Sequence, residues 1–270
     1  ESTIRDFPED VVARNGRAEV LRSLNRLEES LSAYESTIRD FPENVVARNG
    51  RAEVLRSLNR LEESLSAYDV IAERFPYDVV ARNGRATVLA ALGRFEEVLA
   101  QLPDKEPVTD QDWIAYHIRG MVLLRMGKTE EAATVFRKGV NLSPHVDQQD
   151  YFRTGLALAR LKQRDYTKAV EALDYIETTG ADLEASANLL RLHALGSLGK
   201  RSRAVEAYQQ VQAAGRPELR DVGEELRRRY IDGQEGRNSE EWILEKETAV
   251  LLALLASFSV QMMRRRAFPQ

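Results

Sequence analysis

A repeat of 34 residues constrains this chain more than any other feature of its sequence. Residues 1–34 and 35–68 are identical except that Asp10 in the first copy is replaced by Asn44 in the second. A third, looser copy occupies residues 69–102. A fixed period of this length is typical of a stacked array of small units and not of an ordinary globular domain.

Each unit contains two helical segments separated by a turn. Residues of the first segment recur at three- and four-residue spacing, which is one face of a helix: Val11, Arg14, Ala18 and Leu21. The second segment carries a fuller apolar stripe: Leu27, Leu31, Tyr34, Ile38 and Phe41. Asn25 lies between the segments, where later units have glycine, and both residue types tolerate the left-handed turn that ends a helix. Pro42 and Pro76 end the second segments, because proline cannot continue the helical hydrogen bonds.

The clearest unit runs from Trp113 to Pro144. Its aromatic, small and proline residues have the spacing of the tetratricopeptide repeat: Tyr116, Gly120, Leu123, Gly127, Ala132, Phe136, Gly139 and Pro144. The chain therefore resembles the tetratricopeptide repeat family. The resemblance implies an all-α, right-handed solenoid of helix-turn-helix repeats, and we expect a C-terminal apolar helix to cap it.

The repeat pattern predicts five regions along the chain. They are the tail of a preceding repeat (1–10), near-identical repeats (11–102), a joint with Pro103 and Pro107 (103–112), divergent repeats (113–216) and C-terminal helices (217–270). The prolines of the joint are expected to shorten the second helix before it. Residues 1–8 reappear as the end of a second helix at 35–42. We therefore expect the chain to begin inside a repeat, as a region of a longer array.

Composition argues against catalysis and against a dedicated nucleic-acid binder. The formal net charge is -4, whereas nucleic-acid binders usually show a basic footprint. Without cysteine there is no disulfide, thiolate metal site or cysteine nucleophile, which fits a cytoplasmic protein. The three histidines (His117, His145 and His193) lie in different units without ligand spacing. No set of nucleophile, base and orienting residue can be assembled, so we expect no enzyme activity, cofactor or metal.

In the resembled family, the first helices line a concave groove that holds a partner peptide. Carried over to the leading repeats, this groove face contains Asn15, Glu19, Arg22, Asn49, Glu53, Arg56 and Asn83. The asparagines would bond a peptide backbone, and the Glu and Arg side chains would read charge. The alternative is that each Glu pairs with the Arg three residues later and only stabilises its own helix. Acidic Glu19 and Glu53 also argue against the carboxylate clamp of the family's chaperone-binding members.

In the later repeats the same face becomes apolar. It contains His117, Met121, Leu124, Tyr151 and Leu158. Such a face would accept an amphipathic helix from a partner. Two alternatives stay open, namely occupation by the chain's own C-terminal helix and packing inside a tightly wound superhelix.

The C-terminal segment differs from all preceding units. An apolar run extends from Ala249 to Met263 and is closed by Arg264–Arg266. Its candidate packing or membrane-contacting residues are Trp242, Leu251, Leu252, Leu255 and Phe258. A membrane span needs about 20 apolar residues, so packing on the solenoid or on a second copy competes with membrane association.

We therefore expect a non-enzymatic scaffold that binds a protein or peptide partner in a concave groove. The alternatives are a membrane-tethered assembly factor, which would be membrane-associated and not cytoplasmic, and a self-associating module that forms a homo-oligomer.

Overall fold

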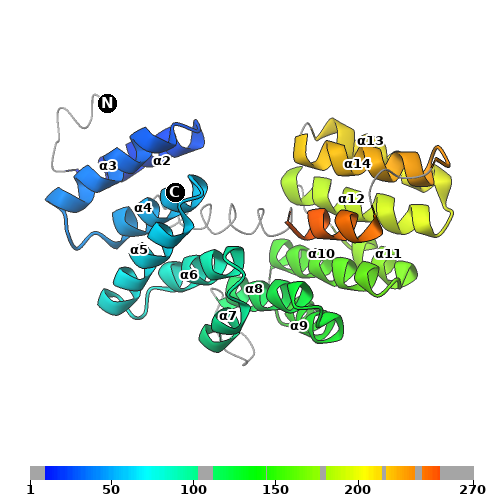
Figure 1. The fold of residues 1–270 in the computed structure, drawn as a ribbon, viewed down its shortest axis with the longest axis horizontal. Helices are drawn as coiled ribbons and strands as arrows, with labels where there is room; N and C mark the ends of the chain where they lie inside the picture. Colours follow the sequence, from blue (N-terminus) through cyan, green and yellow to red (C-terminus); the bar gives the residue numbers. More distant parts are fainter. Residues whose placement is uncertain are drawn as a thin grey trace. The chain divides into compact units, whose positions relative to one another are not determined.

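The computed structural model describes residues 10–102, 112–143, 145–176, 181–214, 217–234 and 239–249. Regular structure in these ranges is helical throughout, which confirms the all-α prediction. The chain forms two compact units (Figure 1). The first contains helices α2 to α7, and the second contains α8 to α14 and a short helix at 240–249.

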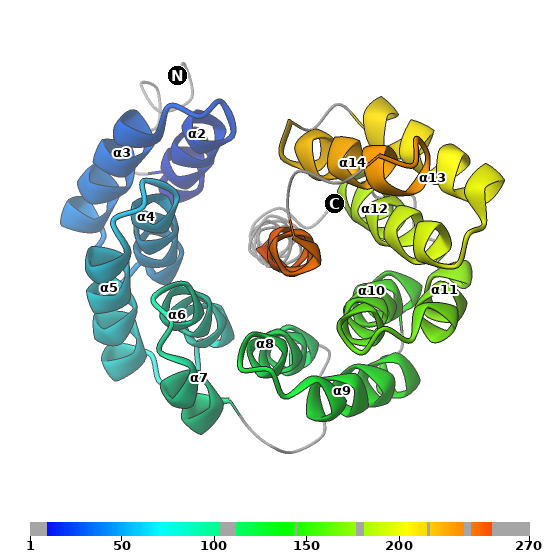
Figure 2. The same ribbon diagram turned by 45° about the vertical axis from the view of Figure 1, so that its right-hand side comes forward.

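The first unit consists of three helix pairs. The helices are α2 (Val11–Ser23), α3 (Leu27–Asp40), α4 (Val45–Ser57), α5 (Leu61–Arg74), α6 (Val79–Ala91) and α7 (Phe95–Gln101). The first helices α2, α4 and α6 form one layer, and the second helices α3, α5 and α7 form the other (Figure 2). Helix α7 has 7 residues against 14 in α5, as the prolines after it predict.

Each first helix of this unit begins behind an acidic or amide side chain. Asp10 accepts hydrogen bonds from the N–H groups of Val12 and Ala13. Asn44 accepts one from the N–H group of Ala47. The single substitution between the first two repeats, Asp10 to Asn44, therefore keeps the helix cap. Asp and Asn are about equally favourable at this position because each supplies an oxygen to an unpaired N–H group.

The predicted left-handed turns are present. Asn25 and Asn59 have φ of 57° and 59°, and Gly127 has φ of 75° at the equivalent position. The turn closes when the residue after it bonds back, as the N–H of Arg26 does to the carbonyl of Leu21 at 2.9 Å. Arg164 has φ of 59° in the same role, although arginine rarely adopts this conformation.

Glycines inside the first helices set the distance between neighbouring repeats. A Cβ atom on Gly50 would lie 2.3 Å from Cζ of Tyr34, which belongs to the preceding repeat. A Cβ on Gly84 would approach Tyr68 in the same way. The glycine of the repeated Arg-Asn-Gly-Arg-Ala sequence therefore allows the close packing of one repeat on the next.

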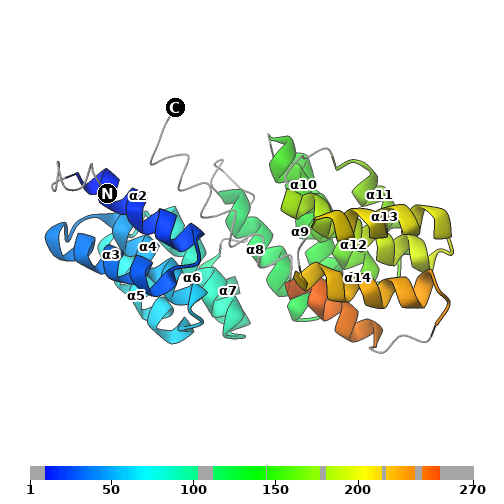
Figure 3. The same cartoon turned by 90° about the horizontal axis from the view of Figure 1, so that it is seen from above.

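The second unit has a two-layer arrangement of its own. Its helices are α8 (Asp112–Arg125), α9 (Thr129–Leu142), α10 (Val146–Lys162), α11 (Tyr166–Asp174), α12 (Ala181–Ser197), α13 (Arg201–Ala213) and α14 (Pro217–Tyr230). Helix α14 packs on both α12 and α13 (Figure 3). Phe136 and Phe152 are fully buried between the layers. The short helix at 240–249 lies against the first-helix layer of this unit, next to α12 (Figure 2).

Candidate interaction surface

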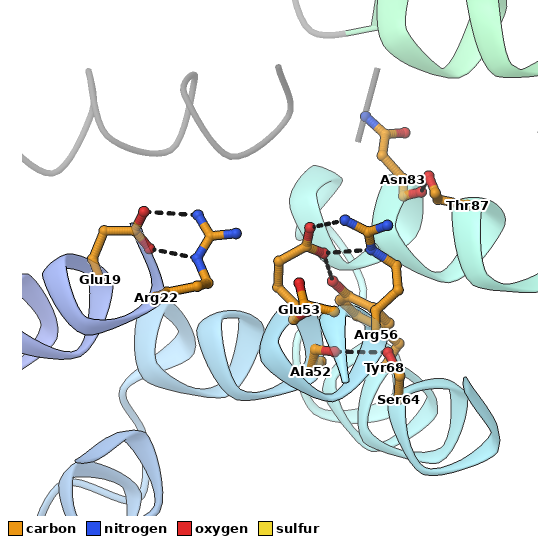
Figure 4. A network of polar contacts seen from close by, with 10 residues as sticks. Glu19, Arg22, Ala52, Glu53, Arg56, Ser64, Tyr68, Asn83 and Thr87 are labelled. Carbon is orange, nitrogen blue, oxygen red and sulfur yellow. Dashed lines mark hydrogen bonds and ion pairs between the residues drawn. The ribbon is translucent and has the colours of Figure 1, made fainter. Parts of the chain in front are cut away.

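A polar network covers the first-helix face of the first unit (Figure 4). Glu53 on α4 accepts hydrogen bonds from Nε and Nη2 of Arg56, the former at 3.2 Å. The hydroxyl of Tyr68, on the following helix α5, donates to the same carboxylate at 3.1 Å. One buried carboxylate thus joins its own helix to the next.

The first repeat contains the same network in a more exposed form. Glu19 accepts from Arg22 at 3.0 and 2.7 Å and from the Tyr34 hydroxyl at 3.3 Å. The side chain of Glu19 is 21% exposed, whereas that of Glu53 is 7% exposed. The pairing of each Glu with the Arg three residues later, which the sequence left as an alternative, is present in both repeats.

Burial and pairing together set the charge states of this network. Burial alone would raise the pKa of the Glu53 carboxyl, but the attraction and hydrogen bonds of Arg56 hold that pKa below its ordinary value. Burial and the nearby Glu53 charge raise the pKa of Tyr68 well above its ordinary value. Glu53 is therefore ionised at neutral pH, and Tyr68 remains a neutral donor.

The arginines keep one donor edge that this network does not use. Their bonds to Glu19 and Glu53 involve Nε and Nη2 only. Among the described residues, no side chain or carbonyl accepts from Nη1 of Arg22 or Arg56. A guanidinium presents five N–H donors in a planar fork, so each arginine retains donors for an external acceptor.

The asparagines of this face link successive repeats. Nδ2 of Asn49 donates to Oδ1 of Asp78 at 3.0 Å, and Asp78 caps helix α6. Nδ2 of Asn15 donates to Oδ1 of Asn44 in the same way, at 3.2 Å. The Oδ1 atoms of Asn15, Asn49 and Asn83 are buried without a hydrogen-bond partner. The amide donors are thus used inside the array, and contact with a peptide backbone stays a prediction.

The third repeat interrupts the charged ladder. Thr87 and Ala90 replace the Glu and Arg of the earlier copies. The Thr87 hydroxyl instead donates to the backbone carbonyl of Asn83 at 2.9 Å (Figure 4). Two exposed valines on the first-helix face precede the ladder residues, Val12 (47% exposed) and Val46 (40% exposed). The face therefore combines paired charges with apolar positions at the repeat spacing.

The corresponding face of the second unit is buried. His117, Met121, Leu124 and Leu158 are at most 1% exposed. His117 lies between the rings of Phe136 and Phe152, and its Nε2 bonds to the carbonyl of Tyr151 at 2.9 Å. Burial lowers the pKa of His117 to about 4, against the opposing effect of that bond. The imidazole is therefore neutral at physiological pH and donates from Nε2.

The helix at 240–249 meets this face through residues that the sequence did not single out. Ile243 is fully buried, and Glu247 lies 3.2 Å from Nδ1 of the fully buried His193. The predicted packing residue Trp242 is only half-buried, and its ring makes a cation–π contact with the ammonium group of Lys246. Leu251, Leu252, Leu255 and Phe258 lie outside the described residues. The repeat spacing places His193 on the first-helix face, which could have indicated a role for it. Its acidic partner Glu247 lies 54 residues away, so the sequence did not reveal the contact.

Other features of the described chain carry less chemistry. A cleft of about 430 Å³ between α4 and α5 is lined in part by Arg48, Arg51 and Glu62. Within the described ranges, no His, Cys, Asp or Glu side chains cluster in a way that would hold a metal ion. Among the helices described here, none combines the length and apolar character that crossing a bilayer requires.

Comparison with known proteins identifies the repeat. Tetratricopeptide repeat profiles match residues 15–79, 79–102 and 114–146. No curated protein sequence matches the chain significantly.

Solved structures share the fold at low sequence identity. A tetratricopeptide repeat protein from Parabacteroides merdae ATCC 43184 is 16% identical with a TM-score of 0.64, over 85% of this chain and 89% of that one. PilF from Pseudomonas aeruginosa is 17% identical with a TM-score of 0.58, over 76% and 92%. A chain of the APC/C hetero-tetramer Cut9–Hcn1 is 16% identical with a TM-score of 0.61, over 83% and 44%. Proteins of this fold generally serve as scaffolds for protein–protein interaction, and the repeat profiles, helix pairing and packing glycines together show that the chain belongs to the tetratricopeptide repeat family.

Proposed function

We propose that this chain is a non-enzymatic scaffold that holds a partner peptide on the first-helix face of its first unit. The observation that carries the proposal is the ladder of Arg22 and Arg56, each fixed by a glutamate and each retaining a free donor edge. Because the guanidinium groups are already oriented, little side-chain entropy is lost when a ligand binds them.

The chemistry of the face defines the class of peptide. The free guanidinium edges can donate hydrogen bonds to a carboxylate or to a backbone carbonyl. The exposed Val12 and Val46 side chains provide apolar contacts at the repeat spacing. A linear peptide that alternates acidic and aliphatic side chains satisfies both features.

Selection from a library of random linear peptides against the full chain tests this proposal. We expect enriched sequences with acidic and aliphatic residues. Their affinity should fall about tenfold in the Val12→Ser/Val46→Ser double variant, because apolar contact area is lost at two positions. Fluorescence anisotropy with a labelled selected peptide measures the change.

Two further variants sharpen the result. Val20→Ser is the matched control, because Val20 is also an exposed valine of α2 (57%) but lies off the ladder face. Arg22→Lys/Arg56→Lys keeps the charge but removes the planar fork, and should weaken binding as well. Selected peptides that bind the valine double variant as tightly as the unaltered chain would overturn the proposal.

Membrane association and self-association stay predictions from the C-terminal sequence. Their main residues, Ala249 to Met263, lie almost wholly outside the described structure, and the described residues favour neither.

A further inference from the structure

The short helix at 240–249 covers a position on the first-helix face that makes polar contacts in another repeat of the chain. His193 lies six residues before the left-handed turn residue Gly199. Glu53 lies six residues before Asn59, and Leu158 six before Arg164. These positions share one place on the first-helix face. Glu247, which contacts His193, therefore sits where a ligand side chain would sit.

The contact with His193 is buried on both sides. The side chains of His193 and Glu247 are each 0% exposed and 3.2 Å apart. The other ring nitrogen, Nε2, has no hydrogen-bond partner and lies 3.9 Å from Oε1 of Glu240. The ring of Tyr230 stacks with the imidazole, with the ring centroids 5.9 Å apart. One histidine thus faces two carboxylates that lie about two turns apart on the same short helix.

A second anchor holds the beginning of the segment. The Tyr166 hydroxyl donates to Glu240 at 3.0 Å, and Nη2 of Arg164 lies 3.3 Å from the same carboxylate. Burial lowers the pKa of Lys162 on the same face. The nearby charges of Glu245, Glu247 and Glu241 oppose this effect. The receiving face is basic and the segment is acidic, so their charges are complementary.

The segment is held by few apolar contacts. Ile243 is its one fully buried hydrophobic side chain among the described residues, and Thr248 is 4% exposed. A buried polar contact such as that of His193 with Glu247 loses hydration when it forms, so it contributes specificity more than net binding energy. An occupant held in this way can be exchanged for another helix of the same pattern.

We propose that the face formed by α10, α12 and the turn before α11 is a docking site for an acidic amphipathic helix. Its partner presents carboxylate, aliphatic and carboxylate side chains at the spacing of Glu240, Ile243 and Glu247. The chain's own 240–249 segment occupies the site and competes with that partner. This inference rests on the proposed function only in taking the first-helix layer as a binding surface, and it concerns the second unit.

Binding of a labelled peptide to the full chain tests the proposal. The probe is an acetylated, amidated and fluorescent peptide with the sequence of residues 239–249. The Glu240→Gln/Glu247→Gln variant weakens the internal occupant but leaves the receiving face intact. It should bind the peptide about tenfold more tightly than the unaltered chain does, if its own segment covers the site about nine-tenths of the time.

Matched variants assign the effect to this site. Glu241→Gln/Glu245→Gln removes the same charge from two exposed glutamates of the same helix, which act on Lys162 through charge alone. It should therefore raise peptide affinity far less than Glu240→Gln/Glu247→Gln does. Adding Tyr166→Phe or His193→Gln to the Glu240→Gln/Glu247→Gln chain should remove the gain. Tyr166→Phe keeps the ring, so a loss of folding does not explain its effect.

Hydrogen exchange of residues 240–249 provides an independent readout. We expect faster exchange there in Glu240→Gln/Glu247→Gln and not in the control pair. Unchanged exchange, or no gain in peptide affinity, would overturn the proposal. Either result would leave peptide binding by the first unit intact, because that binding is tested through Val12 and Val46.

Discussion

At the scale of single residues, Gly50 illustrates how one absent methyl group determines repeat spacing. Gly50→Ala should raise helix propensity by about 1 kcal/mol. The new Cβ, however, would lie 2.3 Å from Cζ of Tyr34, a buried ring that cannot move freely. Overpacking of this kind costs about 1–3 kcal/mol. We therefore expect a net loss in the free energy of unfolding, measured by denaturant titration.

Gly223 provides the comparison for that substitution. It lies within helix α14, and a Cβ there would come no closer than 3.1 Å to the side chain of Val211. Gly223→Ala should cost less than Gly50→Ala. A Gly50→Ala chain as stable as the Gly223→Ala chain would show that Tyr34 does not fix the spacing.

Residue-level prediction from the sequence succeeded where one residue type has one strong local preference. Asn25 was predicted in a left-handed turn because asparagine tolerates that conformation, and it adopts it. Arg164 was not predictable, because arginine normally avoids positive φ. Its guanidinium contacts Glu240, a residue distant in sequence, and local propensity contains no information about such a contact.

At the scale of helices, the two copies of the Glu–Arg–Tyr network should differ in their contribution to stability. Glu53→Ala leaves the fully buried Tyr68 hydroxyl without its acceptor and releases Arg56. We expect a loss of about 2–3 kcal/mol in the free energy of unfolding. Glu19→Ala should cost about 1 kcal/mol, because its pair is more exposed to solvent. Denaturant titration of both variants measures the difference.

Tyr68→Phe separates the hydrogen bond from the ion pair in this network. It removes the donor but keeps Glu53 paired with Arg56, so it should cost less than Glu53→Ala. Equal losses for Glu19→Ala and Glu53→Ala would contradict the role assigned to burial.

The choice between alternatives for whole helices required the structure. The spacing of Glu19 and Arg22 fits both an internal pair and a ligand-reading face, since both lie on one side of the helix. The structure shows the pair and leaves one guanidinium edge free. Similarly, Glu240 and Glu247 read as solvent-exposed residues of an acidic helix. Their partners Tyr166 and His193 belong to other helices, so only the tertiary arrangement reveals the contact.

At the scale of the whole molecule, the period predicted the fold because each repeat packs mainly on its neighbours. The same near-identity of repeats conceals which copy is used for binding. Differences between copies are more informative, such as Thr87 in place of glutamate and His193 in place of Leu158. These differences separate a polar face in the first unit from a buried face in the second.

The two units should therefore respond differently to acid. His117 is 1% exposed, and burial lowers its pKa to about 4, below the ordinary value of 6.5. Between these values the unfolded chain binds a proton that the folded chain does not, so stability falls as pH falls. From pH 7 to pH 5 the second unit should lose about 2 kcal/mol of opening free energy.

The lowered pKa of Glu53 means that its contribution to the first unit is lost only at lower pH, beneath its ordinary value of 4.5. Hydrogen exchange at both pH values, corrected for intrinsic rates, measures each unit separately, and His117→Gln should abolish most of the difference. An equal loss in both units would show that the effect is not specific to the second unit. An undiminished loss in His117→Gln would show that another group is responsible, so either result would contradict this assignment.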